Sequence, residues 1–530
     1  MAMPNTLSND IWYCIATQYL DYRAYTCLSM IDRRLYALLE VNKVACKVVQ
    51  RDHAYTNEAA LAKKGAISWR GAIRYIFLTR EAIARALPSS ACSIENVNEF
   101  RYYQGVLCYK QQGLVRIMNA LATAAGCAVV DVQKAIAQTL PNIARANTDF
   151  QLLHYSNGLL SVLCRLENMS MSTSSLFVRN GDKFIMYGSH SYQRWNENWE
   201  WEIQAVDLET GKAMFEPPIK LSNCDGSEIG KEVCFEMRDS HLYAIFNTPL
   251  NGTRGEINWT SFYHCIRISA ADSKKTMWRR MWRRQDEEGP INDWWTHLSL
   301  DINEATGNLV LTECRREYLG GRSENYRTAY HQIIDGPEPN DCWTVENLEP
   351  AFNGLPHYIP DQLPLNNPLV RLLGSEDRPS YAPPRTRLAS QYHREYIEEE
   401  AESPERQDFN WSCTMFRKYS PRASAFIDVG RKSAADRLCL RVVARRQKCP
   451  IDREGEKGLL YSKAIDEAMF ESRGIKYWPT KDGCPENWNS LGSCSSCSLH
   501  ADGDEHLVAV FNGSKLVIVT FAPDFGHLLP

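Results

Sequence analysis

From Leu7 to Leu39 the chain reads L-S-N-D-I-W-Y-C-I-A-T-Q-Y-L-D-Y-R-A-Y-T-C-L-S-M-I-D-R-R-L-Y-A-L-L. Short polar residues stand at Ser8 or Asn9, at Asp21 and at Asp32, and each can accept a hydrogen bond from an unpaired N–H in the first turn of a helix. Between them, apolar residues recur every three or four positions. The pattern predicts two or three short helices that begin at these caps.

Helices this short carry more apolar surface than they can bury among themselves, because small units bury a low fraction of their surface. Leu28, Ile31 and Leu35 recur as one stripe. The surplus surface has to pack against the rest of the chain or against another protein. The stretch is therefore either a helical cap on a larger domain or a docking module.

The same stretch resembles an F-box, the module that docks the substrate receptor of a ubiquitin ligase onto its Skp adaptor. The family's pattern opens with Leu-Pro-x-Glu-Ile, and this chain has Leu7-Ser8-Asn9-Asp10-Ile11, followed by Leu20-Asp21 and Leu28-Ser29. Ser8 and Tyr22 replace two prolines that are common in the family. The resemblance implies that the adaptor-binding residues are Leu7, Ser8, Ile11, Ile15, Leu20, Leu28, Ile31 and Leu35.

Length and composition predict a globular protein of about two to four domains, since 530 residues exceed one ordinary core. The net charge of −4 gives no overall attraction to nucleic acid or anionic membrane. We see no secretory signal and no apolar run of the roughly 20 residues that a membrane span needs. The 18 cysteines are scattered, which favours free thiols over a disulfide framework. We therefore expect a cytoplasmic or nuclear protein.

After about Asn98 the sequence becomes a series of hairpins. Residues 152–155 and 159–164 flank a Ser-Asn-Gly turn, and residues 507–511 and 516–521 flank Asn-Gly. Residues 130–140 are expected to form a helix inside this region. The pattern predicts a large all-β domain.

Two segments of this region echo each other. Residues 206–212 and 300–308 each contain a strand, an aspartate (Asp207 or Asp301) and a Thr-Gly turn. A repeated polar turn favours an irregular β-propeller, in which small sheets close into a ring and leave few exposed edges. The repeat has no fixed period and no Trp-Asp signature, so an ordinary WD-repeat protein is not expected. A β-sandwich-type irregular domain is the alternative.

The expected fold class is thus α+β and multidomain. A helical F-box domain covers 1–54, a helical linker 55–97 and the β-domain 98–530. Irregular insertions are expected at 346–405, which is rich in proline and lacks apolar periodicity, and at 450–500.

Segments of the β-domain extend the resemblance. Residues 227–236, 259–265, 282–293 and 315–321 are similar to a group of fungal F-box proteins that carry a large C-terminal β-domain without assigned chemistry. The resemblance implies a substrate receptor that binds a target protein and, through the Skp adaptor, a cullin. It does not identify the target.

Cysteine spacing suggests one metal candidate, formed by Cys484, Cys494, Cys497 and His500. The two-residue gap of Cys494 and Cys497 lets two thiolates reach one zinc ion. Structural zinc sites usually use two such doublets, and only one is present. A loop with incidental cysteines is therefore the favoured interpretation, and no cofactor is expected.

Tryptophans at strand ends are candidates for target binding, because loops at a propeller's mouth carry function and tryptophan anchors interfaces. These are Trp195, Trp199, Trp294 and Trp295, and the alternative is that they are buried in the core. The Trp-Arg-Arg pairs at 278–280 and 282–284 could grip nucleic acid, but acidic residues follow at 286–288. Internal ion pairs are favoured there.

Catalytic motifs for serine hydrolases, phosphate-binding loops, zinc proteases and dinucleotide enzymes are absent from the sequence. The sequence predicts a non-catalytic adaptor, the substrate-recognition subunit of a Skp–cullin–F-box ubiquitin ligase. The alternatives are a propeller-fold hydrolase with a helical cap and an F-box scaffold that acts outside a ligase.

Overall fold

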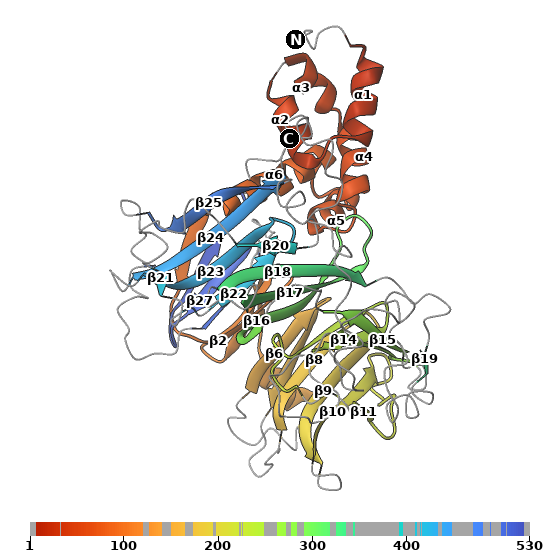
Figure 1. Ribbon diagram of the computed structural model, residues 1–530. Coiled ribbons are helices and arrows are strands. Elements are labelled where there is room, and N and C mark those ends of the chain that lie inside the picture. The colour runs from red at the N-terminus through yellow and green to blue at the C-terminus, as the bar shows by residue number, and fades with distance from the viewer. Residues whose placement is uncertain are drawn as a thin grey trace, which may run out of the picture.

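A computed structural model of the chain describes residues 7–31, 33–119, 127–139, 150–164, 173–193, 198–221, 224, 226–247, 262–271, 277–283, 291–318, 325–334, 343–344, 392–395, 409–410, 414, 416–432, 437–447, 470–480, 488, 500–504 and 506–523. Six helices at the N-terminus stand on one side of a much larger β-domain (Figure 1). No helix in these ranges is long and apolar enough to cross a membrane.

The N-terminal helices, which we call the helical module, are α1 (Asn9–Gln18), α2 (Tyr22–Ser29), α3 (Arg33–Leu39), α4 (Asn42–Asp52), α5 (Asn57–Lys63) and α6 (Trp69–Ala84). Two of the predicted caps are confirmed. Ser8 Oγ accepts from the N–H of Ile11 at 3.4 Å, and Asp21 Oδ1 accepts from that of Ala24 at 2.6 Å. Asp32 lies outside the described residues.

The core of the helical module is formed by small and aliphatic side chains from α1, α3, α4, α5 and α6, together with Tyr25 of α2. The Tyr25 hydroxyl donates to the carbonyl of Leu39, which ties α2 to the end of α3. Because α4 presents Val44, Val48 and Val49 to this core, it serves as the central helix of the module.

Six sheets of four or five strands form a six-blade β-propeller arrangement, which confirms the propeller over the sandwich. In hydrogen-bonded order, the first two blades are β1 (Ser90–Ile94), β28 (Leu516–Thr520), β27 (Leu507–Phe511) and β26 (His500–Gly503), then β2 (Val97–Tyr103), β3 (Val106–Gln111), β4 (Leu114–Asn119) and β5 (Ala128–Val130). The third and fourth blades are β11 (Ile219–Leu221), β10 (Asn198–Asp207), β9 (Phe184–Gln193) and β8 (Thr173–Asn180), then β12 (Val233–Arg238), β13 (His241–Phe246), β14 (Phe262–Ser269), β15 (Met277–Trp282) and β19 (Trp343–Thr344). The fifth and sixth blades are β16 (Ile291–Ile302), β17 (Leu309–Tyr318), β18 (Asn325–Ile334) and β20 (Tyr392–Arg394), then β21 (Phe409–Asn410), β23 (Ala425–Lys432), β24 (Arg437–Gln447) and β25 (Phe470–Trp478), with β22 (Phe416–Ser420) also paired with β23.

A two-stranded sheet of β6 (Phe150–Ser156) and β7 (Leu159–Cys164) lies between the second and third of these blades, where β6 contacts both β2 and β8. The predicted helix precedes it as α7 (Val132–Thr139). The inner strands β26, β2, β6, β8, β12 and β16 contact one another in that order, and β22 contacts β17 and β26. These contacts close the ring.

The ring is closed by a sheet that contains both ends of the β-domain. Strand β1 pairs with β28 from Ser90 opposite Thr520 to Ile94 opposite Leu516. The pairing explains why strands begin at Ser90, ahead of the boundary expected at residue 98. Such closure removes two exposed edges at once.

Both stretches expected to be irregular contain strands, so the expectation is wrong for those parts. Strand β20, within 346–405, pairs with β18, and strand β25, within 450–500, pairs with β24. Strand β25 reads F-E-S-R-G-I-K-Y-W and bulges against β24. Its pairing depends on a distant partner strand, which a local pattern does not reveal.

The two echoing segments form the same turn. Asp207 Oδ1 accepts from the N–H of Thr210 at 2.7 Å, and Asn303 Oδ1 accepts from that of Thr306 at 2.9 Å. The structural counterpart of Asp207 is therefore Asn303, not the Asp301 that the sequence comparison matched. The turn that begins at Asn303 joins β16 to β17, on the face of the propeller that meets the helical module; we call this face the junction face.

Candidate functional site

The helical module exposes large apolar side chains near the start of α1 and in the turn that leads into α3, and Figure 1 shows α1 and α3 on the side of the module away from the propeller. Ile11 is 47% exposed, Met30 67% and Ile31 70%. Arg34 holds this end together, because its Nη2 donates to Asn9 Oδ1 at 2.9 Å and so sets the first turn of α3 beside that of α1. We call Ile11, Met30 and Ile31 the apolar end.

The residues that the resemblance assigns to adaptor binding fall into different environments. Ile11 and Ile31 are exposed, Ser8 is the exposed cap of α1, and Leu35 is only 3% exposed. The remaining four are half-buried, and two of them pack against the module's core; they are Leu7, Ile15, Leu20 and Leu28.

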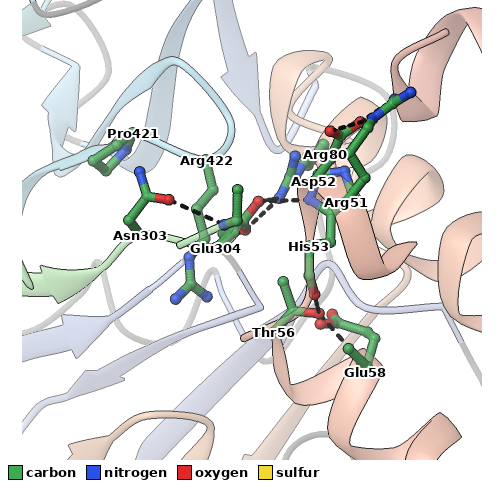
Figure 2. A network of polar contacts seen from close by, with 12 residues as sticks. Arg51, Asp52, His53, Thr56, Glu58, Arg80, Asn303, Glu304, Pro421 and Arg422 are labelled. Atoms are coloured by element: carbon green, nitrogen blue, oxygen red, sulfur yellow. Dashed lines mark hydrogen bonds and ion pairs between the residues drawn. The ribbon is translucent and has the colours of Figure 1, made fainter. Parts of the chain in front are cut away.

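Opposite the apolar end, the helical module joins the propeller through the carboxylate of Glu304 (Figure 2). Glu304 Oε2 lies 2.8 Å from His53 Nδ1 and accepts from Arg80 Nη2 at 2.6 Å. Arg422, in the turn after β22, lies 3.3 Å from Oε1 through its Nε. The N–H of Tyr55 donates to the carbonyl of Glu304 at 2.9 Å.

The charge of Glu304 is stabilised by these partners. Burial alone would raise its pKa, but Arg80, His53 and Arg422 outweigh burial and hold the pKa well below its ordinary value. A carboxylate that is both buried and paired with cations is ionised at neutral pH. The junction is therefore a charged contact inside the protein.

Two further ion pairs cross the same junction. His506 Nε2, in the turn between β26 and β27, lies 3.1 Å from Glu58 Oε1 in α5. Arg473 Nη2, in β25, lies 3.0 Å from Glu81 Oε2 in α6. Because the contacts come from three separate blades, the helical module is held against the propeller at several points.

A pocket of about 540 Å³ opens where three inner strands lie side by side. It is lined by Ser175 and Leu176 of β8, by the 227–231 turn that leads into β12, and by Thr296 and His297 of β16. From Thr296 to Ile302 the strand spans about 20 Å, and beyond Ile302 the chain turns at Glu304. The pocket therefore lies toward the face opposite the junction face, which we call the free face.

The described lining of this pocket is polar and balanced in charge. Lys231 Nζ pairs with Glu228 Oε2 at 2.5 Å. Burial lowers the pKa of His297 to about 4, with Lys418 adding to the effect and Asp301 opposing it, so the imidazole is neutral at pH 7. The pocket thus offers hydrogen-bonding groups without a net charge.

Thr296, a residue that lines the pocket, has a buried hydroxyl. Thr296 is only 8% exposed, and among the described residues its Oγ1 has no hydrogen-bond partner. A buried polar atom without a partner costs free energy, so such atoms are rare and often mark sites that a ligand or water completes. By contrast, Ser175 Oγ already donates to the carbonyl of Ser227 at 2.7 Å.

A buried carboxyl group on strand β12 does not belong to this pocket. Glu236 of β12 accepts from the hydroxyl of Tyr103 in β2, and its Oε2 lies 3.7 Å from Arg179 Nε. Burial raises the pKa of Glu236, and Arg179 opposes the rise. Among the described residues, no group of three or more potential ligands is arranged to hold a metal ion.

The tryptophan candidates are only partly described. Trp199 is exposed and stacks on His190 with ring centroids 5.6 Å apart. The ring of Trp295 lies 3.5 Å from the Arg417 guanidinium and 4.8 Å from that of Arg316. Trp195 and the side chain of Trp294 lie outside the described residues.

The zinc candidate cannot be assembled from described residues, since Cys484, Cys494 and Cys497 lie outside them. His500 is described, and its ring packs 5.4 Å from that of Phe100. In the Trp-Arg-Arg region, Arg283 is buried and pairs with Glu313 at 2.6 Å. Its guanidinium is thus part of an internal ion pair with Glu313, and the acidic run at 286–288 lies outside the described residues.

Sequence reasoning missed Glu304, His53 and Thr296. The only local signal was the echoing turn, which contains Glu304 at the position of Leu208. No protein-family model matches this chain, and no curated protein matches it in sequence.

Proposed function

We propose that this protein is the substrate-recognition subunit of a Skp–cullin–F-box ubiquitin ligase. In this proposal the apolar end of the helical module binds the Skp adaptor, and the propeller binds a target protein. The protein itself performs no chemistry, and it raises the local concentration of the target near the ubiquitin-conjugating enzyme.

The observation that carries the proposal is the apolar end. Met30 and Ile31 lie in the turn between α2 and α3, where their side chains are 67% and 70% exposed. Clustered exposed apolar groups mark protein interfaces more often than chance placement does. The stretch that resembles an F-box contains the same residues, and Figure 1 shows α1 and α3, which begin beside them, on the side of the module away from the propeller.

The junction supports the proposal through geometry. An adaptor of this kind works best when the target site and the docking site keep a constant separation, because a loose linkage dilutes the effective concentration. The contacts of Glu304, Glu58 and Glu81 with the propeller and the helical module hold the two parts together.

The test uses the full-length chain, purified Skp adaptor and a cullin. We expect the three proteins to elute together in size-exclusion chromatography. A folded chain that does not elute with the adaptor would contradict the proposal and favour the helical-cap interpretation. A complex that contains the adaptor but excludes the cullin would favour a scaffold that acts outside a ligase.

The hydrolase alternative is favoured by one observation, the raised pKa of Glu236 beside Tyr103. A carboxyl group with a raised pKa can act as a general acid. Assays with chromogenic ester and glycoside substrates test this alternative, with Glu236→Gln as the control. Turnover that is lost in this variant would replace the adaptor proposal with an enzymatic one.

A further inference from the structure

We propose that the side of β7 away from β6, which we call the β7 edge, is the target-binding site, and that it binds a segment of about five mostly apolar residues as an added strand. The inference rests on the proposed function, because it names the class of target for the propeller. It uses three features: the narrow sheet to which β7 belongs, the unprotected sequence of this strand, and an exposed tyrosine on the neighbouring blade.

The sheet of β6 and β7 is narrower than the blades on either side of it. The second and third blades each have four strands, and no described strand pairs with the β7 edge. Strands of one sheet lie about 4.8 Å apart, so the two neighbouring blades extend about 10 Å farther from the propeller axis than β7 does. The β7 edge is therefore set back between these blades.

The sequence of β7 has none of the residues that protect a free strand edge. It reads L-L-S-V-L-C, without a charged residue or a proline, and all six residues are partly exposed. Free edges are normally protected by charges, proline, bulges or short length. Strand β25, the outer strand of its blade, shows such protection, because it contains Glu471, Arg473 and Lys476 and bulges against β24. The β7 edge is instead open to pairing with another strand.

Tyr187 of β9 lies on the face of the third blade that is turned toward β7. Asn180 of β8 identifies this face, because its Nδ2 donates to the carbonyl of Leu159 in β7 at 2.9 Å. Ile185 is the cross-strand partner of Asn180, and Tyr187 follows two positions later, so both share this face. Tyr187 is 39% exposed, whereas Met186, on the opposite face, is fully buried. Because β7 itself lies against β8 here, a strand added to β7 would lie against β9 and its tyrosine.

Apolar residues flank the β7 edge on both faces. An added strand points alternate side chains to opposite faces of its sheet. On one face these would meet Tyr187, and on the other they would continue the row of Leu160, which packs in one cluster with Ile136 of α7. Glu202, one strand beyond Tyr187 on the third blade, already pairs with Lys220 at 3.4 Å. A charged residue in the added strand would lose water without gaining a described partner, so the target segment is apolar on both faces.

Position and depth select the occupant of the β7 edge. Figure 1 shows β9 and β10 at the end of the β-domain farthest from the helical module, so an adaptor on the apolar end leaves this edge accessible. In a second copy of the chain the same edge is set back by the same distance, so the flanking blades would collide before two such edges could pair. A single extended segment is narrow enough to enter, which favours a target segment over a dimer.

The first experiment measures fluorescence polarisation of a labelled peptide, Lys-Gly-Val-Ile-Val-Leu-Val-Gly-Lys, with the full-length protein. Two further peptides are N-methylated at one or the other alternate set of core residues, which removes the N–H groups from one side of the strand at a time. We expect the parent peptide to bind, one methylated peptide to lose binding and the other to keep it, because only one side of an added strand pairs with β7. Aspartate in place of the isoleucine and leucine should weaken binding by at least about tenfold.

Tyr187→Ala tests the neighbouring blade. Loss of an aromatic contact should weaken binding of the parent peptide by about tenfold. Ile333→Ala is the matched control, because Ile333 is similarly exposed, at 41%, but lies on β18 in the fifth blade. Both side chains are more than a third exposed, so neither substitution should lower the melting temperature measurably. We expect Ile333→Ala to bind the peptide like the wild type.

Hydrogen exchange identifies what covers the β7 edge. Amides of β7 that point away from β6 should exchange quickly in the free protein and slowly once the peptide is added. Slow exchange in the free protein would show that the chain itself covers the edge, and a dimer that the peptide dissociates would show that a second copy does. Either result would overturn the inference, as would no binding of the parent peptide, equal binding of the two methylated peptides, or equal affinities of Tyr187→Ala and Ile333→Ala.

Adaptor binding is measured on the same samples. Absence of adaptor binding in the wild type would remove the ligase role and leave the peptide site standing. Intact adaptor binding without peptide binding would remove only the peptide site.

Discussion

His53 Nδ1, at the end of α4, lies 2.8 Å from Oε2 of Glu304, in the turn between β16 and β17. These residues are 251 positions apart in the chain. The pair joins the part of the protein that resembles an F-box to the part that we propose binds the target. Because Arg80 and Arg422 reach the same carboxylate, Glu304 is the centre of the junction (Figure 2).

Glu304→Gln is expected to weaken the junction. Removing one partner of a buried ion pair leaves uncompensated charge, here on Arg80 and Arg422, and typically costs about 3 kcal/mol. The loss should appear as a lower melting temperature of the helical module, followed by circular dichroism. Glu209→Gln, in the equivalent turn between β10 and β11, is the control, because Glu209 is exposed and should change nothing measurable. Equal melting temperatures for the two variants would contradict this role of Glu304.

Gly307→Ala tests the close approach of the same turn to the helical module. A Cβ on Gly307 would lie 2.5 Å from the ring of Tyr55, whereas a Cβ on Gly211, in the equivalent turn, meets nothing within 4 Å. Both glycines have positive φ, so both substitutions cost about 1 kcal/mol in backbone strain. Only Gly307→Ala should speed hydrogen exchange at the N–H of Tyr55, which donates to Glu304. Slow exchange at Tyr55 in both variants would show that the contact is loose.

The junction should be most stable in a window of pH. Burial alone would lower the pKa of His506, but Asp504 and Glu58 raise it well above its ordinary value of 6.5. The contribution of His506 to the free energy of unfolding is therefore complete below pH 6.5, and it is lost as the pH rises through the raised pKa. The pKa of Glu58 and that of Glu304 are lowered from 4.5, so their contribution is present above 4.5 and is lost as the pH falls through the lowered values.

The measurement for this window is the melting temperature as a function of pH. We expect a maximum between about 4.5 and 6.5, and a flatter decline on the alkaline side for His506→Gln. The surface variant His241→Gln, whose imidazole lies outside the junction, is the control. An unchanged alkaline decline in His506→Gln would exclude His506 as its source.

Leu35 and Ile31 should respond differently to truncation, although one sequence stripe contains both. Leu35 is buried, so Leu35→Ala should lower the free energy of unfolding by about 2–4 kcal/mol. Ile31 is exposed, so Ile31→Ala should change it by less than about 0.5 kcal/mol. Chemical denaturation of the two variants measures the difference. Similar losses would mean that Ile31 is part of the core.

Local patterns account for much of the fold. The caps Ser8 and Asp21 and the hairpin of β27 with β28 follow from neighbouring residues, and they were predicted. The stripe of Leu28, Ile31 and Leu35 crosses the helix cap expected at Asp32, so its three residues do not share one helix. Helix α2 ends at Ser29 and α3 starts at Arg33, so Ile31 lies in a turn and points outward.

Features that depend on distant partners could not be predicted. Strand β1 pairs with β28 more than 400 residues away, and β25 is a strand only because β24 lies beside it. Glu304 looks like an ordinary residue of a polar turn until His53 and Arg80 are placed against it. The same holds for Thr296, since its lack of a partner is a property of the packed structure.

The most direct test of the central claim is the affinity of the full-length protein for purified Skp adaptor, measured by surface plasmon resonance. Ile11→Asp/Ile31→Asp places charges on the apolar end, and Ile333→Asp, at 41% exposure on β18, is the matched control. We predict that the double variant remains folded and loses at least about 2 kcal/mol of binding, roughly 30-fold in affinity, while Ile333→Asp binds like the wild type. Equal binding by all three proteins would contradict the proposal that the apolar end docks the adaptor.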